Sequence, residues 1–284
     1  MKSIVITGVS TGIGWGAAKV AIRKGFRVFG SVRKAADAER LSAEFGPNFT
    51  PLIFDVTDEA AVAQAAAQVR AALAGETLFG LVNNAGVAVA GPLLHLPIEE
   101  FRQQIEINLT GAVIVTQAFA PLLGADKDLK GPPGRIVNIS SVGGRNGTPF
   151  LAPYNASKFA LEGLSEALRR ELMVFGIDVI VIAPGAVATA IWGKAEQVDV
   201  TPYRNTVFAP ALDGMRAYML ANGGKGLKPE ALGEAILHAL TTPKPKVRYT
   251  VAPDPITEFM ISHLPRRTVD RMMAGRLGLS PRKG

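Results

Sequence analysis

The sequence predicts an α/β protein built on a doubly wound parallel sheet. Short apolar segments alternate with Ala-rich helical segments, and the apolar segments show no polar alternation. Strands that are covered by helices on both faces have this continuous apolar character. No break in composition divides residues 1–190, and 48% of the 284 residues are hydrophobic. We therefore expect a single domain over residues 1–284.

Six segments rich in Val, Ile, Leu and Phe are predicted to be strands, because each is short and is followed by turn-forming residues or a helical segment. They cover residues 3–7, 26–31, 50–54, 78–82, 135–139 and 178–182. Residues 248–251 form a candidate last strand. A helical segment lies between each of the six strands and the next, which favours parallel pairing.

The predicted helices cover residues 14–24, 35–44, 59–74, 98–123, 154–175 and 229–240. An Ala-rich composition favours the helix over residues 59–74, and Pro229 suits the first turn of the last helix. Residues 190–228 mix Gly, Pro and Asn with apolar residues, which predicts a helical lid over a site. Residues 255–284 are expected to form a C-terminal extension that is helical in part.

The net charge of +7 is concentrated in residues 261–284, which hold six basic residues and one acid. Nucleic-acid-binding domains usually have a broad basic face with aromatic residues, so no nucleic-acid partner is expected. We interpret the tail as a solvated end, with a membrane-surface contact as the lesser alternative. Its apolar residues suit a helix that closes the pocket or a subunit contact.

The composition also excludes several kinds of site. The chain has no cysteine, which rules out disulfides, thiolate metal sites and a thiol nucleophile. His95, His238 and His263 show no metal-ligand spacing, so no metal is expected. The most apolar stretch, residues 179–192, is interrupted by a Pro-Gly pair, so no membrane span is predicted. A cytoplasmic location is the default interpretation.

Residues 7–14 read Thr-Gly-Val-Ser-Thr-Gly-Ile-Gly and lie between the first predicted strand and helix. Glycines let the backbone turn sharply and let a pyrophosphate approach its N–H groups, and the helix N-terminus adds a positive dipole. The spacing differs from the general G-x-G-x-x-G fingerprint, and a purely structural turn is the alternative. The position of the turn favours a dinucleotide site formed by Gly8, Ser10, Thr11, Gly12, Ile13 and Gly14.

The end of the second predicted strand indicates which dinucleotide binds. NAD sites usually place Asp or Glu there to bind the ribose 2′-hydroxyl. This sequence has Ser31-Val32-Arg33-Lys34 instead, and Arg33 suits a 2′-phosphate, which an acid would repel. We therefore predict NADP(H) as the cofactor. The alternative is that Arg33 and Lys34 only begin a solvated helix.

Over residues 1–190 the sequence resembles the short-chain dehydrogenase/reductase family. The resemblance is carried by the 7–14 turn, Asn83-Asn84-Ala85-Gly86, Ser141, Tyr154-Asn155-Ala156-Ser157-Lys158 and Pro184-Gly185. It implies a Rossmann fold, a nicotinamide cofactor, and an oxidoreductase that moves a hydride between the cofactor and a carbonyl or alcohol carbon. Residues 141–163 are similar to the branch that contains hydroxysteroid and retinol dehydrogenases.

Tyr154 and Lys158 are expected to share one helix face, since they are four positions apart. A phenol normally titrates near ~10, and a neighbouring ammonium is expected to lower the pKa of Tyr154. The phenol can then donate a proton to a carbonyl oxygen or accept one from an alcohol. Ser141 follows the fifth predicted strand, where its hydroxyl can bind the same oxygen. A simple cap or turn residue is the alternative for Ser141.

The resemblance assigns roles to the remaining candidate residues. Asn108 would complete a proton relay through a water near Lys158, and Lys158 would also hold the nicotinamide ribose. A satisfied buried polar group is the alternative for Asn108. The usual separation of thirteen residues from Tyr154 selects Ser141 over the adjacent Ser140. Further implied cofactor contacts are Asp55, Val56, Asn84, Ala85, Gly86, Pro184, Gly185, Val187 and Thr189.

Apolar residues in the predicted lid, among them Trp192, Tyr203 and Phe208, suggest a hydrophobic substrate such as a steroid, a retinoid, or a long-chain or aromatic ketone or alcohol. Packing of these residues against the core is the alternative. Two other functions stay open: an NAD(H)-dependent alcohol dehydrogenase of a smaller polar substrate, and a non-catalytic dinucleotide-binding regulator. The resemblance also implies a homodimer or homotetramer, with helices 98–123 and 154–175 as contacts.

Overall fold

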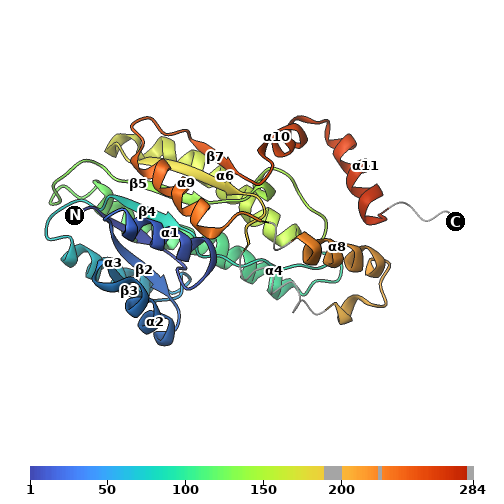
Figure 1. Ribbon diagram of the computed structural model, residues 1–284, viewed down its shortest axis with the longest axis horizontal. Coiled ribbons are helices and arrows are strands. Elements are labelled where there is room, and N and C mark those ends of the chain that lie inside the picture. The colour runs from blue at the N-terminus through green and yellow to red at the C-terminus, as the bar shows by residue number, and fades with distance from the viewer. Residues whose placement is uncertain (189–199, 223–225, 280–284) are drawn as a thin grey trace.

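The computed structural model of the chain describes residues 1–188, 200–222 and 226–279. Seven parallel strands form one sheet in the order β3-β2-β1-β4-β5-β6-β7, with helices on both faces (Figure 1). The strands are β1 (Ser3–Ile6), β2 (Arg27–Val32), β3 (Phe49–Ile53), β4 (Gly80–Asn83), β5 (Arg135–Ile139), β6 (Asp178–Pro184) and β7 (Arg248–Val251). The predicted doubly wound parallel sheet is confirmed.

Helices cover the sheet in two layers. Helices α1 (Gly12–Arg23), α2 (Ala35–Phe45) and α9 (Pro229–Thr241) bury their apolar residues on one face. Helices α3 (Glu59–Ala72), α5 (Gly111–Phe119) and α6 (Ala152–Glu171) pack on the other face. The remaining described α-helices are α4 (Ile98–Ile105), α8 (Ala209–Asn222), α10 (Pro255–His263) and α11 (Arg266–Leu277).

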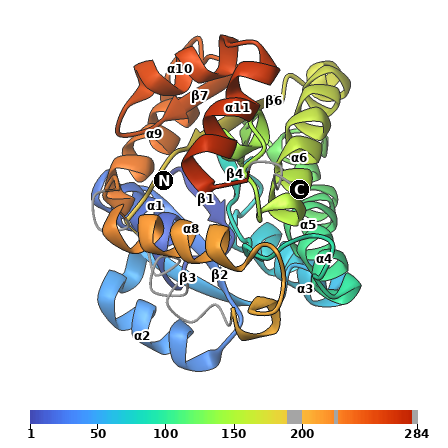
Figure 2. The same cartoon turned by 90° about the vertical axis from the view of Figure 1, so that its right-hand side faces the viewer.

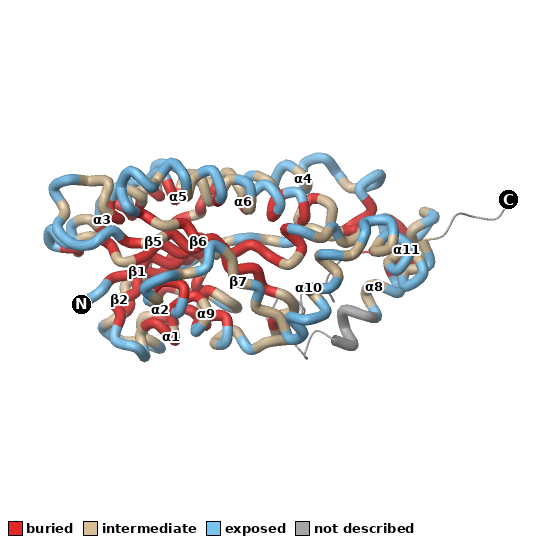
Figure 3. The backbone as a smooth tube through the Cα atoms, turned by 90° about the horizontal axis from the view of Figure 1, so that it is seen from above, coloured by how far each residue is buried: buried red, intermediate tan, exposed pale blue. Residues whose placement is uncertain are grey.

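Strand β1 shows why the apolar segments lack polar alternation. Ile4 and Ile6 are buried in the core on the α1 side, and Val5 is buried in the core on the α3 side. Successive side chains of a strand point to opposite faces, so a sheet that is covered twice needs apolar residues at every position. In Figure 3 the strands form a buried centre between more exposed helices.

The segment predicted as one helix over residues 98–123 contains a change of helix type. A π-helical turn at Glu106–Thr110 separates α4 from α5, and a 3-10 turn follows at Ala120–Leu123. Asn108 lies in the π-turn and is 1% exposed. Single π-turns within helices often occur at functional sites, because they change the direction of a side chain.

Among the described residues, the helix Ile98–Leu123 is long and apolar enough to cross a membrane by length and composition. The prediction from the sequence considered only residues 179–192 as a candidate span, and it was wrong to leave this longer apolar segment out. Its apolar side chains Val115, Phe119, Leu122 and Leu123 are buried in the core beside α3. Packing within the protein accounts for them, and core helices commonly meet the same criterion.

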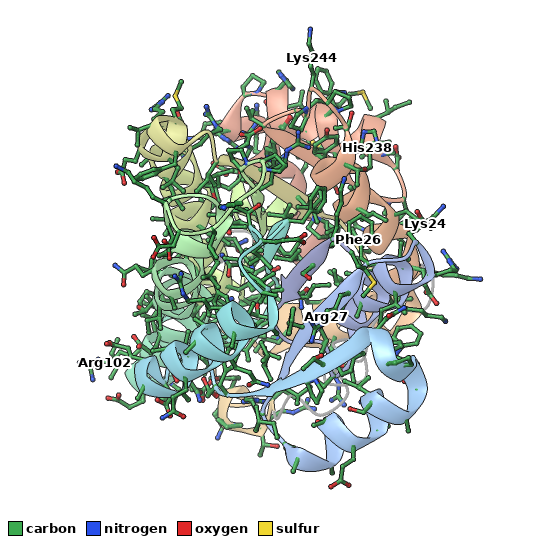
Figure 4. All side chains as sticks on the ribbon, turned by 90° about the vertical axis from the view of Figure 1, so that its left-hand side faces the viewer. Lys24, Phe26, Arg27, Arg102, His238 and Lys244 are labelled. Atoms are coloured by element: carbon green, nitrogen blue, oxygen red, sulfur yellow. The ribbon has the colours of Figure 1, made fainter. Side chains whose placement is uncertain are left out.

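The two ends of the sheet differ in what covers them. Lys24, Phe26 and Arg27 lie at the end where the strands begin, which faces the viewer in Figure 4. There the Phe26 ring packs against Phe79, and Arg27 donates to the Ala72 carbonyl. Helices α8 and α11 lie at the opposite end, which faces the viewer in Figure 2. The carboxyl ends of the strands point toward that end, where ligands bind in such sheets.

Candidate active site

The glycine turn between β1 and α1 is held by side chains of two neighbouring strands. The Thr7 hydroxyl accepts hydrogen bonds from the backbone amides of Asn84 and Ala85 at 2.9 and 3.0 Å. The Asn84 Nδ2 donates to the carbonyls of Thr7 and Gly8 at 2.8 and 3.0 Å. The Ser31 Oγ accepts from the Gly8 amide at 3.0 Å. These bonds place the turn between β1 and β4, where the strand order reverses.

Three positions of this turn require glycine. Two have backbone angles that favour glycine, and the third has no space for a Cβ. Gly8 and Gly12 have φ angles of +70° and +64°, which favour glycine. A Cβ on Gly14 would lie 2.3 Å from the Gly8 carbonyl oxygen and 2.5 Å from the Asn84 Nδ2. The backbone at the start of α1 is therefore bare, and this cradle fits a dinucleotide pyrophosphate.

Other predicted cofactor residues lie around this turn. Thr11 is the N-cap of α1, and Ile13 packs against the core. Val56 is 7% exposed and would contact a Cβ on Gly111 at 2.7 Å. A Cβ on Gly86 would lie 3.1 Å from the Asn108 Oδ1.

Three charged residues lie near the end of β2. Arg33 follows the strand directly, its side chain is 67% exposed, and its Nη1 lies 3.8 Å from the Asp55 Oδ2. Arg40 reaches the glycine turn from α2, where its Nη2 donates to the Ser10 carbonyl at 2.8 Å. Sequence reasoning missed Arg40, because its approach to Ser10 depends on how α2 packs. Arg40 is also paired with Asp37 at 3.0 Å and with Glu44 at 3.5 Å, so carboxylates offset the charge of both arginines.

Ser141, Tyr154 and Lys158 meet at the carboxyl end of β5. The Ser141 hydroxyl and the Tyr154 ring lie close together beside Gly143, where an added Cβ would be 3.3 Å from the Ser141 Oγ and 3.6 Å from the Tyr154 Cε1. The Ser141 Oγ also accepts from the Gly143 amide at 3.0 Å. The Lys158 Nζ lies 5.8 Å from the centre of the Tyr154 ring and donates to the Ile139 carbonyl at 2.7 Å. The structure also separates the two serines, because the Ser140 hydroxyl instead donates to Glu162 at 3.0 Å.

The pKa values of this cluster differ from the expectation. Burial raises the pKa of Tyr154, while the hydrogen bond from Ser141 acts in the opposite direction. Burial lowers the pKa of Lys158 from 10.5 to about 8. The predicted net lowering of the Tyr154 pKa by the ammonium is therefore wrong for this structure. Both groups lose water on burial, and desolvation disfavours the phenolate more than its neighbours favour it.

Asn108 is a fully bonded buried residue. Its Oδ1 accepts from the Val87 amide at 2.9 Å, and its Nδ2 donates to the Val87 carbonyl at 3.0 Å and the Ser157 Oγ at 3.2 Å. The side chain thus joins the loop after β4 to α6, one residue before Lys158. This geometry matches the alternative of a satisfied polar group, and the water relay stays a prediction.

The residues after β6 lie beside β7. Pro184 ends the strand, and the Gly185 amide donates to the Val251 carbonyl at 2.9 Å. Val187 is 6% exposed and pairs with Leu227 in an isolated bridge. Thr189 and Trp192 lie outside the described residues.

An aromatic cluster lies between α8 and the segment that precedes Tyr154. The rings of Phe150 and Phe208 meet edge to face at 5.9 Å and 75°. Phe150, Tyr203 and Leu212 are buried together. Phe150 has a φ angle of +65°, which is strained for an aromatic residue, and the Gly91 amide donates to its carbonyl at 2.8 Å. Part of the predicted lid therefore packs against the body of the protein.

The fold and the site define an oxidoreductase of the dinucleotide-binding α/β class. Residues 2–199 match the model of the short chain dehydrogenase family. The chain belongs to the short-chain dehydrogenase/reductase family, whose members act on CH–OH and C=O groups. The resemblance found in the sequence is thereby confirmed.

Individual relatives extend the match to nearly the whole chain. An NADPH-dependent 3-dehydrocapnine reductase of Ornithobacterium rhinotracheale is 40% identical over 273 residues, which is 96% of each chain. A crystal structure of a short-chain dehydrogenase from Streptomyces avermitilis is similar with a TM-score of 0.75 and 27% identity, over 98% of this chain and 97% of that one.

Two solved relatives were bound to different cofactors. A serine dehydrogenase in its closed form, complexed with NADP+, is 25% identical over 88% of this chain and 94% of that one, with a TM-score of 0.73. A 3-ketoacyl-(acyl-carrier-protein) reductase from Brucella melitensis, complexed with NADH, is 29% identical over 88% of this chain and 96% of that one, with a TM-score of 0.69.

Proposed function

We propose that this protein is an NADP(H)-dependent reductase or dehydrogenase of a hydrophobic carbonyl or alcohol. The observation that carries the proposal is the close approach of the Ser141 hydroxyl and the Tyr154 ring beside Gly143, with the Lys158 ammonium 5.8 Å from the centre of that ring. The three groups lie at the carboxyl edge of the sheet, on the same edge as the glycine turn.

The roles of the three side chains follow from their chemistry. Bound nicotinamide supplies the hydride acceptor or donor. Tyr154 holds the proton that a substrate oxygen receives in reduction, and takes it back in oxidation. Ser141 donates a hydrogen bond to the same oxygen and stabilises its developing charge. Lys158 keeps a positive charge beside the phenol and is placed to hold the ribose. A raised pKa keeps Tyr154 protonated at neutral pH, which suits reduction.

Arg33 supports the choice of NADP(H), together with the NADPH-dependent relative at 40% identity. The Arg33 side chain is exposed after β2, where no acid precedes it. Arg40 donates to the Ser10 carbonyl, but Asp37 and Glu44 offset its charge. Asp55 lies close to Arg33 and partly offsets its charge. The Brucella melitensis relative was solved with NADH, so NAD(H) stays the alternative cofactor.

The substitution Arg33→Asp tests the cofactor assignment. We expect the ratio of kcat/KM for NADPH to kcat/KM for NADH to fall roughly 10- to 100-fold, because a charge-assisted bond to the 2′-phosphate is replaced by repulsion. Lys24→Asp, at the opposite end of the molecule (Figure 4), makes the same change in charge and should leave the ratio unaltered. An equal ratio in wild type and Arg33→Asp would contradict the assignment.

Other assignments stay proposals. The apolar cluster of Phe150 and Phe208 supports a hydrophobic substrate, and a panel of steroid, retinoid, long-chain and small polar ketones would test it by kcat/KM. A homodimer or homotetramer through the outer sides of α4–α5 and α6, a cytoplasmic location, and residues 190–228 and 255–284 as lid and extension are further predictions. Sedimentation velocity would test the subunit number.

A further inference from the structure

Glu162 is a nearly buried carboxylate that the proposed chemistry does not use. It lies on α6 one turn after Lys158 and two turns after Tyr154, so the three side chains leave the same side of the helix. Only 12% of the Glu162 side chain is exposed. A carboxylate this deep in a protein needs several hydrogen-bond partners.

The partners of Glu162 come from two elements besides α6. The Ser140 Oγ donates at 3.0 Å, the Arg145 Nε at 3.1 Å, and the Arg248 Nε at 3.0 Å to both oxygens. Ser140 and Arg145 flank the 3-10 turn Val142–Gly144, and Arg248 begins β7.

The fit around this carboxylate is tight. A Cβ on Gly144 would lie 2.5 Å from the Ser140 Oγ and 3.2 Å from the Glu162 Cγ. From the other side, Arg266 of α11 donates to the Asn146 Oδ1 at 2.7 Å and the Arg145 carbonyl at 3.2 Å. The chain around this turn is thus bonded from α6 and α11, and Arg248 of β7 bonds to the same Glu162 carboxylate.

Glu162 lies behind the reacting groups. A cavity of about 390 Å³ between α6, β7 and the C-terminal helices is lined by Arg145, Glu162, Arg248 and Arg266. Ser141 and Tyr154 do not line this cavity. Glu162 bonds to residues on both sides of the turn that follows Ser141, and its hydrogen bonds go to Ser140, Arg145 and Arg248 rather than to the reacting groups.

We propose that Glu162 is a positioning residue, whose carboxylate fixes residues 140–145 so that the Ser141 hydroxyl stays on Tyr154. The inference rests on the proposed oxidoreductase function. A carboxylate accepts from Ser140 and both arginines at once, since it has two oxygens and no N–H. An amide in its place has one acceptor oxygen and turns N–H donors toward the guanidinium groups.

The test uses Glu162→Gln and Ser140→Ala in the full-length protein. Ser140→Ala removes the bond to Glu162 on the Ser141 side of the turn and leaves the bonds of Arg145 and Arg248 to Glu162 in place. In both variants we expect kcat for ketone reduction to fall roughly 10- to 100-fold, because small displacements of reacting groups are costly. The Kd for NADPH, measured by fluorescence titration, should stay within about twofold, since Glu162 does not touch the glycine turn.

The pH profile separates positioning from loss of structure. Ser141 from the 3-10 turn and Lys158 from α6 face the Tyr154 phenol, and the Ser141 bond holds the pKa of Tyr154 below the value that burial alone would set. Loss of that bond raises the pKa, so the limb of the kcat/KM profile that reports the phenol should move to higher pH in both variants.

Glu166→Gln is the matched control. Glu166 lies one turn further along α6, is 56% exposed and bonds to Arg170 on the same helix. It should keep the wild-type kcat and pH profile.

Two results would overturn the proposal: folded Glu162→Gln and Ser140→Ala with wild-type kcat and pH profile, or a fall in NADPH affinity as large as the fall in kcat. If Glu162→Gln does not fold, Ser140→Ala alone decides. A wild-type protein that binds NADPH and reduces no carbonyl contradicts the proposed function instead. The Tyr154 titration, read as phenolate absorbance against Tyr154→Phe, would still report whether Glu162 holds Ser141.

Discussion

The proposed cofactor side of the site, at the glycine turn, and its proposed substrate side, at the aromatic cluster, are stabilised by different forces. On the cofactor side, Thr7, Ser31 and Asn84 fix the glycine turn through hydrogen bonds of 2.8 to 3.0 Å to backbone groups. On the substrate side, Phe150 and Phe208 meet through ring contacts, among apolar residues of α8. The first side is directional and close-fitting, and the second is apolar and adaptable.

The two sides should differ in how many amino-acid substitutions they tolerate. A hydrogen bond weakens steeply when its angle or length changes, so the glycine turn accepts few substitutions. Apolar cores accept other side chains of similar volume at small cost. If the proposed function holds, substitutions in the aromatic cluster should change substrate preference while cofactor binding is kept. Helices α8, α10 and α11 also show more exposed chain than the sheet (Figure 3), and Phe259 is 65% exposed.

The largest expected effect is at the boundary of the two sides. Tyr154→Phe should reduce kcat by roughly 10³-fold, because general acid–base catalysis by the phenol is lost, and it should leave the Kd for NADPH unchanged. Stopped-flow turnover and fluorescence titration would measure the two quantities. A variant with ordinary turnover would remove Tyr154 from the mechanism.

Lys158 should make stability depend on pH. Burial lowers the pKa of the Lys158 amine to about 8 in the folded protein, against 10.5 for a hydrated lysine side chain. Between these pH values the unfolded chain binds more protons, so the free energy of unfolding should rise with pH, by about 3 kcal/mol over the window. Below pH 8 the contribution is constant.

Lys158→Met is the comparison for that measurement. Urea unfolding between pH 7 and pH 10.5 gives the free energy of unfolding of each protein. The wild-type value minus the Lys158→Met value should increase with pH. A difference that does not change with pH would contradict the burial of the amine. The same variant should lose both rate and NADPH affinity, and unchanged kinetics would refute the dual role of Lys158.

Gly14→Ala should disrupt the glycine turn on the proposed cofactor side. The added Cβ would meet the Gly8 carbonyl at 2.3 Å, and a backbone atom cannot move away cheaply. We expect a loss of about 2 kcal/mol of stability and weaker NADPH binding. Gly275→Ala in α11 is the control, because nothing lies within 4 Å of its Cβ. It should change stability by no more than about 1 kcal/mol, and similar behaviour of the two variants would contradict the cradle.

The smallest effect is expected on the substrate side. Phe208→Ala removes the edge contacts to Phe150 and His95, both at 5.9 Å, which are worth about 1 kcal/mol each. KM for hydrophobic ketones should rise several-fold, while NADPH binding stays as in wild type. Phe259→Ala, on the exposed side of α10, controls for the loss of a phenyl group. A change in NADPH affinity would show that the two sides are coupled.

The sequence by itself determined the sheet, the glycine turn and the family. Residues 4–6 and 179–182 are apolar at every position because the sheet buries both faces, and that pattern is visible in the chain alone. Gly8 and Gly12 are needed for backbone angles that few other residues adopt, so their meaning is local. The spacing of Ser141, Tyr154 and Lys158 is likewise a property of short segments.

Only the tertiary structure decided what depends on burial and on distant neighbours. The direction of the Tyr154 pKa follows from how much water the fold removes, which no spacing reveals. Arg40 reaches Ser10, and Glu162 gathers Ser140 and Arg248, across gaps of up to 86 residues. Electrostatic energies and hydrogen bonds depend on distances in space, and the packing of helices on the sheet sets those distances.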